Sequence, residues 1–254
     1  MVDIHCHLLP ALDDGAKDES VALEMAKMSA ADGVTHVVAT PHSSYRYQFD
    51  PEVNRRKRDE LQQAVGDSLT ILLGCDFHLS YENLEDLRLH PDYYSINGHQ
   101  YLLVEFADTG LPPSIDQIFF DLLSRKITPI ITHPERNPLL CRSLGQIQKW
   151  IGSGCYVQVT AGSFLGRFGK QALKVSQSLL RYNMVHFIAS DAHDTVHRPP
   201  LLSSACRAIA AEQGEEVAHA LSEANPRAVI EGRSLPWQPE LLPIQERKWF
   251  SLRR

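Results

Sequence analysis

The sequence predicts an α/β fold in which parallel strands alternate with helices, either as a closed (β/α) barrel or as a doubly wound sheet. Seven short segments are almost uninterrupted runs of apolar residues, which is typical of strands buried on both faces of a parallel sheet. Helical patterns separate these segments. No low-complexity linker or internal repeat divides the 254 residues, so we expect a single domain.

The first half of the chain gives four of the strands. The helix expected over residues 19–32 has apolar residues near helical spacing and ends at Gly33. Pro41 ends the second strand, and Asn97-Gly98 indicates a tight turn before the fourth. The predicted elements are strands at 2–5, 36–40, 70–74 and 101–106, and helices at 19–32, 51–65 and 82–89.

The second half repeats the alternation three times and adds a helical end. Ser114 is expected to cap the helix that follows it, with Asp116 in the first turn. Gly152 closes the helix before the sixth strand. The predicted elements are strands at 128–132, 156–160 and 186–190, and helices at 114–125, 143–151, 170–182, 199–213 and 215–223.

The end of the chain differs from the rest. From Pro236 it is rich in proline and charge and carries Trp237 and Trp249. We therefore expect a domain over residues 1–235 and a C-terminal tail over residues 236–254.

Composition and charge argue against several classes of protein. Hydrophobic residues make up 43% of the chain and charged residues 22%, which suits a globular protein with a large core. The formal net charge of −6 argues against a nucleic-acid-binding surface, which is usually basic. The five cysteines are scattered without a Cys-x-x-Cys pair, as in a reducing compartment. With no signal peptide and no apolar run of membrane-spanning length, we expect a cytoplasmic protein without membrane insertion.

Imidazole and carboxylate side chains follow almost every predicted strand. Side chains alternate faces along a strand, so His5 and His7 point the same way and Cys6 points opposite. The carboxyl ends of parallel strands form one rim, where these groups are expected to meet. Nine residues are candidate metal ligands there: His5, His7, Asp14, His42, Asp76, Glu105, His133, Asp191 and His193.

The types of ligand narrow the choice of metal. Imidazole and carboxylate without thiolate suit Mn²⁺, Fe²⁺ or Zn²⁺ and disfavour a structural thiolate zinc site. At about three protein ligands for each open catalytic ion, nine ligands predict three metals. Such a cluster activates water and holds an anionic oxygen group. Arg136 is placed to clamp a phosphate or carboxylate, and Arg198 is a second candidate on the same rim.

Other polar residues near the rim receive more modest expectations. The loop of residues 43–47 follows His42 and is a candidate substrate-contacting lid, with Tyr45 and Arg46 as the candidate contacts. Glu135 is expected to orient a ligand histidine. His36 and His186 open strands at the opposite rim and are expected to be structural, whereas His78 is a candidate to reach the site.

Five segments together resemble the polymerase-and-histidinol-phosphatase (PHP) superfamily. They are Asp-Ile-His-Cys-His, Ala-Thr-Pro-His, Leu-Leu-Val-Glu-Phe, Thr-His-Pro-Glu-Arg-Asn and Ser-Asp-Ala-His, in the order and spacing of that superfamily from residue 1 to about 235. The branch they resemble is that of the bacterial manganese-dependent protein-tyrosine phosphatases that regulate capsule and exopolysaccharide synthesis.

The resemblance implies a distorted (β/α)₇ barrel with three Mn²⁺ ions on the nine candidate ligands, with Fe, Zn or Mg as other possible metals. It implies hydrolysis of phosphotyrosine on the C-terminal tail of a bacterial tyrosine autokinase. Asp76 departs from the family, which usually has Glu at this position. Its shorter side chain would reduce the affinity for one metal ion. The roles carried over are catalytic for His42, Arg136 and Arg198, and substrate-binding for Arg136, Arg198, Tyr45 and Arg46.

Three other functions stay open. One is a small-molecule phosphomonoesterase of the same superfamily, for example on histidinol phosphate. Another is a metal-binding partner subunit without activity of its own. A third is an amidohydrolase, although that group commonly uses a carboxylated lysine and no lysine follows a predicted strand. The Cys-x5-Arg signature of thiol phosphatases is missing, and the sequence leaves the oligomeric state undetermined.

Overall fold

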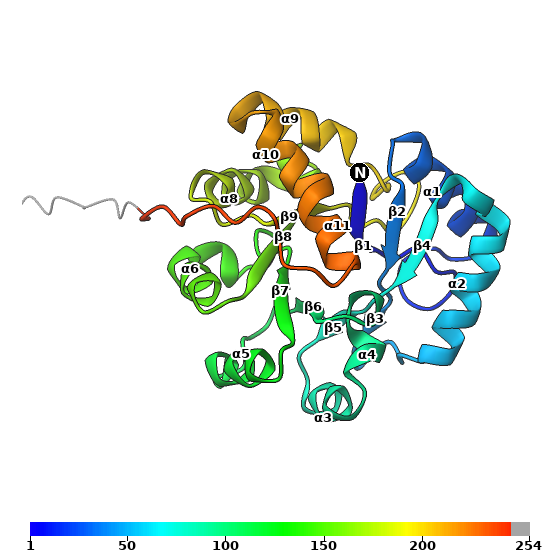
Figure 1. Cartoon of the computed structure of the whole chain (residues 1–254), viewed down its shortest axis with the longest axis horizontal. Helices are drawn as coiled ribbons and strands as arrows, with labels where there is room; N and C mark the ends of the chain where they lie inside the picture. Colours follow the sequence, from blue (N-terminus) through cyan, green and yellow to red (C-terminus); the bar gives the residue numbers. More distant parts are fainter. Residues whose placement is uncertain (245–254) are drawn as a thin grey trace, which may run out of the picture.

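The fold is a ring of parallel strands surrounded by helices (Figure 1). It is seen in a computed structural model, which describes residues 1–244. Every strand pairing in this part of the chain is parallel. The strands are β1 (Val2–Cys6), β2 (His36–Ala39), β3 (His42–Ser43), β4 (Thr70–Leu73), β5 (Asp76–His78), β6 (Tyr101–Glu105), β7 (Thr128–Thr132), β8 (Tyr156–Thr160) and β9 (Phe187–Ala189).

The ring is distorted because two of the seven predicted strands are each divided. The predicted strand 36–40 ends as β2 and resumes as β3, and the predicted strand 70–74 ends as β4 and resumes as β5. The pieces belong to two sheets, with orders β1-β2-β4 and β3-β5-β6-β7-β8-β9. A parallel bridge from Cys6 to Ala192 links β1 to the chain just after β9. Seven strand positions therefore surround one axis, and the predicted α/β barrel is confirmed.

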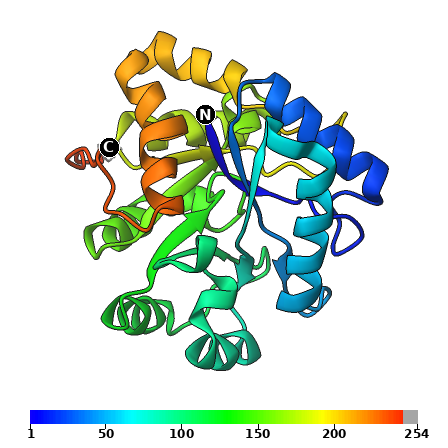
Figure 2. The same cartoon turned by 45° about the vertical axis from the view of Figure 1, so that its right-hand side comes forward.

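Helices cover the outside of the strands (Figure 2). Asp18 caps α1 by accepting a hydrogen bond from the Val21 amide, and Asp50 caps α2 just before Pro51. Ser114 takes the predicted N-cap position of α5, but its side chain makes no capping bond. The α-helices are α1 (Glu19–Ala31), α2 (Pro51–Val65), α3 (Tyr81–Leu89), α4 (Pro91–Tyr94), α5 (Ile115–Ser124), α6 (Leu144–Gly152), α7 (Ala161–Phe164), α8 (Gly169–Arg181), α9 (Ser203–Gln213), α10 (Glu215–His219) and α11 (Asn225–Ile230).

Short helical turns complete the secondary structure of the described residues. The predicted helix 215–223 continues beyond its expected end: α10 is followed by a π turn, which leads directly into α11. The predicted turn at Asn97-Gly98 is present, with Asn97 at φ 51°. The turns are the 3₁₀ segments Gly66–Ser68, Ile96–Gly98 and Leu140–Arg142 and the π segment Ala220–Ala224.

Helix α2 covers the edge of β4 where the first sheet ends. Gln62 accepts from the Ile71 amide at 2.7 Å and donates to the Leu69 carbonyl at 2.9 Å. The Arg58 guanidinium donates to the Ile71 carbonyl. Side chains of α2 thus take the place of a neighbouring strand, which satisfies backbone groups that would otherwise be exposed at this edge.

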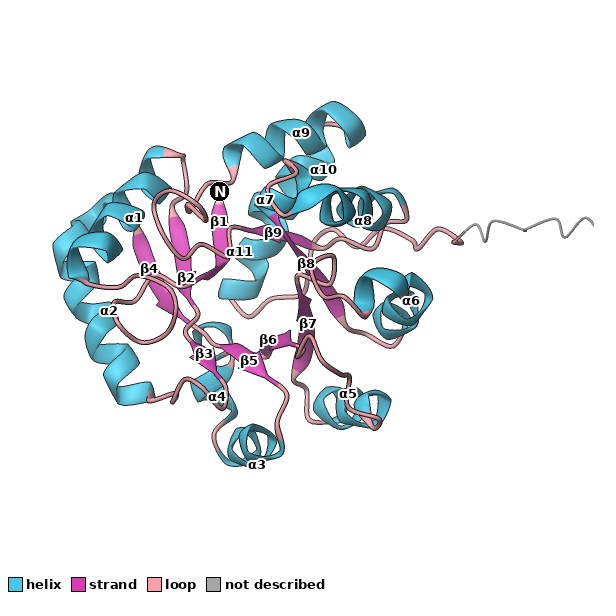
Figure 3. Cartoon of the chain, turned by 180° about the vertical axis from the view of Figure 1, so that it is seen from behind, coloured by secondary structure: helices cyan, strands magenta, loops and turns pink. Residues whose placement is uncertain are grey.

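One end of the ring is closed by α11. In Figure 1 this helix lies across the front of the strands, and in Figure 3 it lies behind them. Val229 and Ile230 of α11 form a buried cluster with Val2 and Ile4 of β1. The opposite end of the ring, where the strands finish, is therefore the end at which the polar side chains that follow the strands can meet.

The last described residues run over the outside of the barrel. Leu242 donates from its amide to the Tyr182 carbonyl and accepts from Gln148. Trp237 packs against the main core, whereas Trp249 lies outside the described residues. None of the helices within residues 1–244 combines the length and the hydropathy needed to cross a bilayer.

Candidate metal centre

All nine predicted ligands meet at the carboxyl ends of the strands. They form four overlapping groups in which the potential ligand atoms lie within 4.8 Å of one another. Among residues 1–244 these groups contain the nine predicted residues and no other. The groups are His7, Asp14, His42 and His193; His5, His7 and Asp76; His5, His133 and Asp191; and His42, Asp76 and Glu105.

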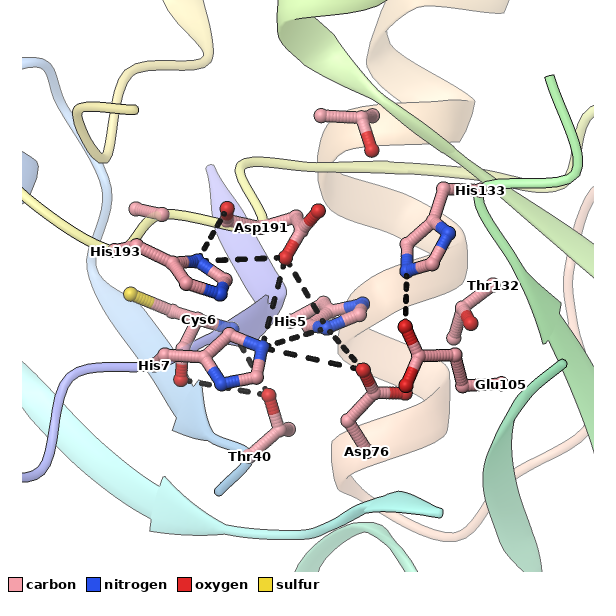
Figure 4. A network of polar contacts seen from close by, with 12 residues as sticks. His5, Cys6, His7, Thr40, Asp76, Glu105, Thr132, His133, Asp191 and His193 are labelled. Carbon is pink, nitrogen blue, oxygen red and sulfur yellow. Dashed lines mark hydrogen bonds and ion pairs between the residues drawn. The ribbon is translucent and has the colours of Figure 1, made fainter. Parts of the chain in front are cut away.

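His5 and His7 present their Nε2 atoms to the centre of the site (Figure 4). The Nδ1 of His7 lies 2.8 Å from Asp13 Oδ2, and a carboxylate can only accept, so this nitrogen carries the proton. The Nδ1 of His5 lies 3.0 Å from Gln158 Oε1. Each ring, when it is neutral, therefore turns the lone pair of Nε2 inward, the orientation that a metal ligand needs.

His193 and His42 meet Asp14 on the outer side of the site. His193 places Nδ1 3.0 Å from the Asp191 carbonyl, to which it donates, and its Nε2 lies 3.5 Å from Asp14 Oδ1. His42 Nε2 lies 3.4 Å from the same Asp14 oxygen. One carboxylate oxygen thus faces two imidazole nitrogens, and these three donors could hold a cation.

Asp76 supplies the clearest sign that the site is built for cations. The side chain is fully buried, and neither carboxylate oxygen has a hydrogen-bond partner within the described residues. Its Oδ2 lies 3.4 Å from both His5 Nε2 and His42 Nδ1, so the shorter aspartate still reaches two ligand histidines. A buried carboxylate without hydrogen bonds is costly unless its charge is balanced, and divalent metal ions would balance it. The residues present therefore fit a metal cluster.

The charges at the centre perturb one another strongly. Burial disfavours protonation of His5, but Asp76 and Asp191 outweigh burial and raise its pKa to about 9. Burial and the neighbouring Asp76 raise the pKa of Glu105 to about 8. Against the effect of burial, contacts with Asp14, Asp76 and Glu105 raise the pKa of His42 to about 10. Several groups therefore hold protons at neutral pH that a metal would displace.

Two candidate ligands sit on strained backbone. His133 has φ 32° and Asp191 has φ 50°, in the left-handed region that residues other than glycine rarely adopt. The His133 amide is held by the Gln158 carbonyl and the Asp191 amide by the His5 carbonyl. Such conformations cluster at functional sites, where the surrounding structure holds them in place.

Arg136 and Arg198 both contact Asp191 at the rim. The Nη1 of Arg136 and the Nη2 of Arg198 donate to Asp191 Oδ2, the latter at 2.6 Å. The Phe168 ring lies below both guanidinium groups, 4.4 Å from the central carbon of Arg136 and 6.0 Å from that of Arg198. Two cations therefore border the candidate ligands from one side.

Two orienting residues, Asp13 and Gln158, were missed by the sequence analysis. Asp13 accepts from the amides of Gly15 and His42 as well as from His7, so it connects the first loop to the start of β3. An added Cβ at Gly15 would collide with the His7 carbonyl. The adjacent acidic pair at 13–14 was the available signal, but it does not say which carboxylate faces the metals.

The loop after His42 differs in part from expectation. Tyr45 is 83% exposed, and Arg46 donates to its hydroxyl at 2.7 Å. Tyr47 is the aromatic residue that stacks on His42, with ring centroids 5.6 Å apart and planes 13° apart. The substrate-binding role of Tyr45 and Arg46 stays a prediction, and Tyr47 is an additional candidate.

Four other polar residues were given roles in the sequence analysis, and for one of them, Glu135, the role was wrong. The interpretation of Glu135 as an orienter of a ligand histidine was wrong: its Oε1 accepts from the Thr160 amide and from Ser163. His186 is buried and accepts from the Val157 amide, a structural role, and His36 is partly exposed on β2. His78 belongs to none of the four ligand groups.

Comparison with known proteins gives consistent results. Residues 1–231 match the family model described as capsular polysaccharide synthesis, CpsB/CapC. The chain is 34% identical to tyrosine-protein phosphatase YwqE of Bacillus subtilis, over 98% of this chain and 99% of that protein. It is 34% identical to the putative tyrosine-protein phosphatase CapC of Staphylococcus aureus, over 99% and 100% of the two chains. It is 30% identical to tyrosine-protein phosphatase CpsB of Streptococcus pneumoniae, over 91% and 98%.

Comparison with solved structures points to the same group of proteins. A crystal structure from a study of YwqE and CpsB, described there as unique metal-dependent tyrosine phosphatases, superposes with a TM-score of 0.89 at 31% identity. The match covers 97% of this chain and all of the other. A lactonase from Listeria monocytogenes shares the fold alone, with a TM-score of 0.60 at 11% identity.

Proposed function

The chain belongs to the CpsB/CapC family of capsular polysaccharide synthesis, and on that premise we propose that it is a metal-dependent protein-tyrosine phosphatase. Its relatives at 30–34% identity are named tyrosine-protein phosphatases, in one case a putative one, and the alignments cover nearly the whole length of each. The reaction is the hydrolysis of a phosphoric monoester.

The observation that carries the proposal is the buried carboxylate of Asp76. Neither oxygen makes a hydrogen bond with a described residue, and Oδ2 lies 3.4 Å from histidine nitrogens of β1 and β3. Without a metal these histidines must hold protons to balance the buried charge, whereas divalent cations would balance it and leave the histidines neutral. We propose that Mn²⁺ ions, three in number, occupy the four overlapping groups, with Fe, Zn or Mg as alternatives. Metal ions bound there would activate water and neutralise charge on the phosphoryl group.

The chain's own residues complete the site. Arg136 and Arg198 have more donors than Asp191 uses, and a phosphoryl group beside them can accept the others. Asp13 and Gln158 hold the protons of His7 and His5 on Nδ1, so the inward nitrogens stay available. Tyr47, stacked on His42, offers a flat ring beside which an aromatic phosphate can lie.

The leaving group explains why no strong acid is needed. The phenolate of tyrosine has a pKa near 10, so it departs more readily than an alkoxide. This favours phosphotyrosine over an alkyl ester such as histidinol phosphate. We propose phosphotyrosine on the C-terminal tail of a bacterial tyrosine kinase as the substrate, in the cytoplasm, with residues 1–235 as the catalytic domain.

The test compares substrates and a ligand variant. Protein loaded with Mn²⁺ is assayed on a phosphotyrosine peptide, p-nitrophenyl phosphate and histidinol phosphate. The proposal expects peptide turnover well above that of histidinol phosphate, and loss of turnover in His133→Ala. Preference for histidinol phosphate would indicate a small-molecule phosphatase, and activity unaffected by His133→Ala would indicate a partner subunit contaminated by another enzyme.

A further inference from the structure

A cavity lies beside Arg136, next to the metal centre. Its volume is about 350 Å³, and its lining includes Arg136, Arg142, Phe168 and Gln171. Arg136 also lines a smaller cavity together with the candidate ligands Glu105 and His133. The two cavities share the Arg136 side chain as a wall. A ligand whose phosphate binds at Arg136 therefore has a neighbouring cavity into which its remaining atoms can extend.

The surroundings of this cavity are strongly basic. A second pocket, which shares Phe168 with this cavity, is lined by Arg167 and Arg198. Among the described residues, Glu135 is the sole carboxylate that lines the large cavity or this second pocket, whereas Glu105 and Asp108 line the smaller cavity. Glu135 is only 2% exposed, and its Oε1 accepts from buried donors rather than from an arginine. Four arginines thus border the two spaces: Arg136, Arg142, Arg167 and Arg198.

Two of these four arginines form no ion pair with another described residue of the chain. Arg136 and Arg198 contact Asp191, whereas Arg142 and Arg167 are exposed and have no ion-pair partner within residues 1–244. The chain carries a net charge of −6, so an unpaired group of cations beside the site is a local reversal of the general charge. Such a patch attracts negatively charged partners.

The loop that bears Phe168 gives the patch a defined shape. Gly166 and Gly169 flank the ring with φ 73° and 88°, values that glycine adopts without strain. These turns bring the ring back onto Arg136 and Arg198. The wall between the phosphate position and the cavity is therefore an ordered arginine–aromatic stack.

We propose that this cavity and the pocket that shares Phe168 with it form a subsite for the residues next to phosphotyrosine, and that the subsite selects acidic side chains through Arg142 of the cavity and Arg167 of the pocket. The inference rests on the proposed phosphatase function and names the class of peptide that the site prefers. A phosphotyrosine bound at Arg136 carries its neighbouring residues past Phe168, where glutamate or aspartate meets unpaired guanidinium groups.

The test uses matched phosphotyrosine peptides that differ only in glutamate or glutamine, placed before or after the phosphotyrosine. For the Mn²⁺-loaded wild type we expect a kcat/KM ratio of about two to five in favour of glutamate on one side, because exposed ion pairs contribute modestly. The ratio should fall as salt is raised. In Arg142→Gln it should approach one, and Arg167→Gln should lower it in part.

Arg125→Gln is the matched control. It removes the same charge at an exposed position between α5 and the start of β7, at the opposite end of the barrel, and should keep the wild-type ratio. Thermal unfolding of each variant shows whether it is folded. Equal turnover of the glutamate and glutamine peptides by wild type, or an undiminished ratio in both Arg142→Gln and Arg167→Gln, would overturn the subsite alone. Failure to hydrolyse any phosphotyrosine peptide would overturn the proposed phosphatase as well.

Discussion

His5 Nε2 lies 3.2 Å from His7 Nε2 at the centre of the barrel rim. When both rings are neutral, their lone pairs face each other, because Gln158 and Asp13 hold the two Nδ1 positions. In the metal-free protein Asp76 and Asp191 raise the pKa of His5 to about 9, and the proton that His5 then holds relieves this repulsion. A cation beside both nitrogens would convert the same geometry into ligation.

The contact between Asp13 and His7 predicts an effect on metal affinity. Asp13→Asn removes the charge that keeps the proton of His7 on Nδ1, so metal affinity should fall about 10- to 100-fold. Asp18→Asn is the control, because asparagine caps a helix as well as aspartate and Asp18 caps α1 away from the ligands. Competition with a chromophoric chelator measures the affinity. Equal affinities of the two variants would contradict the assigned role of Asp13.

The raised pKa values predict how stability depends on pH without metal. The pKa of Glu105 is about 8, against 4.5 unfolded, and that of His5 is about 9, against 6.5. The folded state therefore binds more protons than the unfolded state between these values, so its stability decreases as pH rises. Chelator-treated protein should have a lower free energy of unfolding at pH 9 than at pH 7, measured by denaturant titration.

Metal-loaded protein is the control for this pH effect, because the metals displace the same protons. Its decline between pH 7 and pH 9 should be smaller. If the free energy of unfolding of the metal-free protein instead rose from pH 7 to pH 9, the raised pKa values of Glu105 and His5 would be contradicted.

Arg136 is expected to act on turnover and not on metal content. Arg136→Gln removes donors beside the phosphoryl position, so kcat/KM should fall about 100-fold, as for other electrostatic donors at a reacting group. The nine ligands are unchanged, and Arg198 still contacts Asp191. Elemental analysis checks the metal content, and Arg125→Gln is the charge-matched control. Loss of metal in Arg136→Gln would instead assign this arginine to support of Asp191.

Gly15 gives a prediction about the first loop. Gly15→Ala should unfold more easily by roughly 1–3 kcal/mol and bind metal more weakly, because the added methyl group collides with His7. Gly145 in α6 has open space around its Cβ position, so Gly145→Ala should be neutral or stabilising by about 0.5–1 kcal/mol. Denaturant midpoints decide the comparison. Equal stability of the two variants would mean that the loop moves without cost.

The alternation of strands and helices and the meeting of the nine candidate residues could be predicted because both depend on local pattern. Short apolar runs mark buried parallel strands, and the residues at their ends must meet at one rim. The division of two strands could not be predicted, since β3 and β5 have two and three residues, too few for any periodicity. Their separate sheet is nevertheless what brings His42 opposite Asp76.

Contacts between distant side chains were also beyond the sequence. Nothing local indicates that Gln158 on β8 contacts His5 on β1, or that Asp191 accepts from both Arg136 and Arg198. The left-handed backbone at His133 and Asp191 is equally invisible, because neither residue type requires it. Long-range packing decides all three features.

Removal and return of metal tests the central claim most directly. Protein stripped by a chelator and then dialysed is assayed for phosphate release from a phosphotyrosine peptide, before and after addition of Mn²⁺. We expect no release from the stripped protein, and restored release that rises to a plateau near three Mn²⁺ per chain. Full activity in the stripped protein, or no activity with Mn²⁺, Fe²⁺, Zn²⁺ or Mg²⁺, would contradict a metal-dependent phosphatase built on these nine residues.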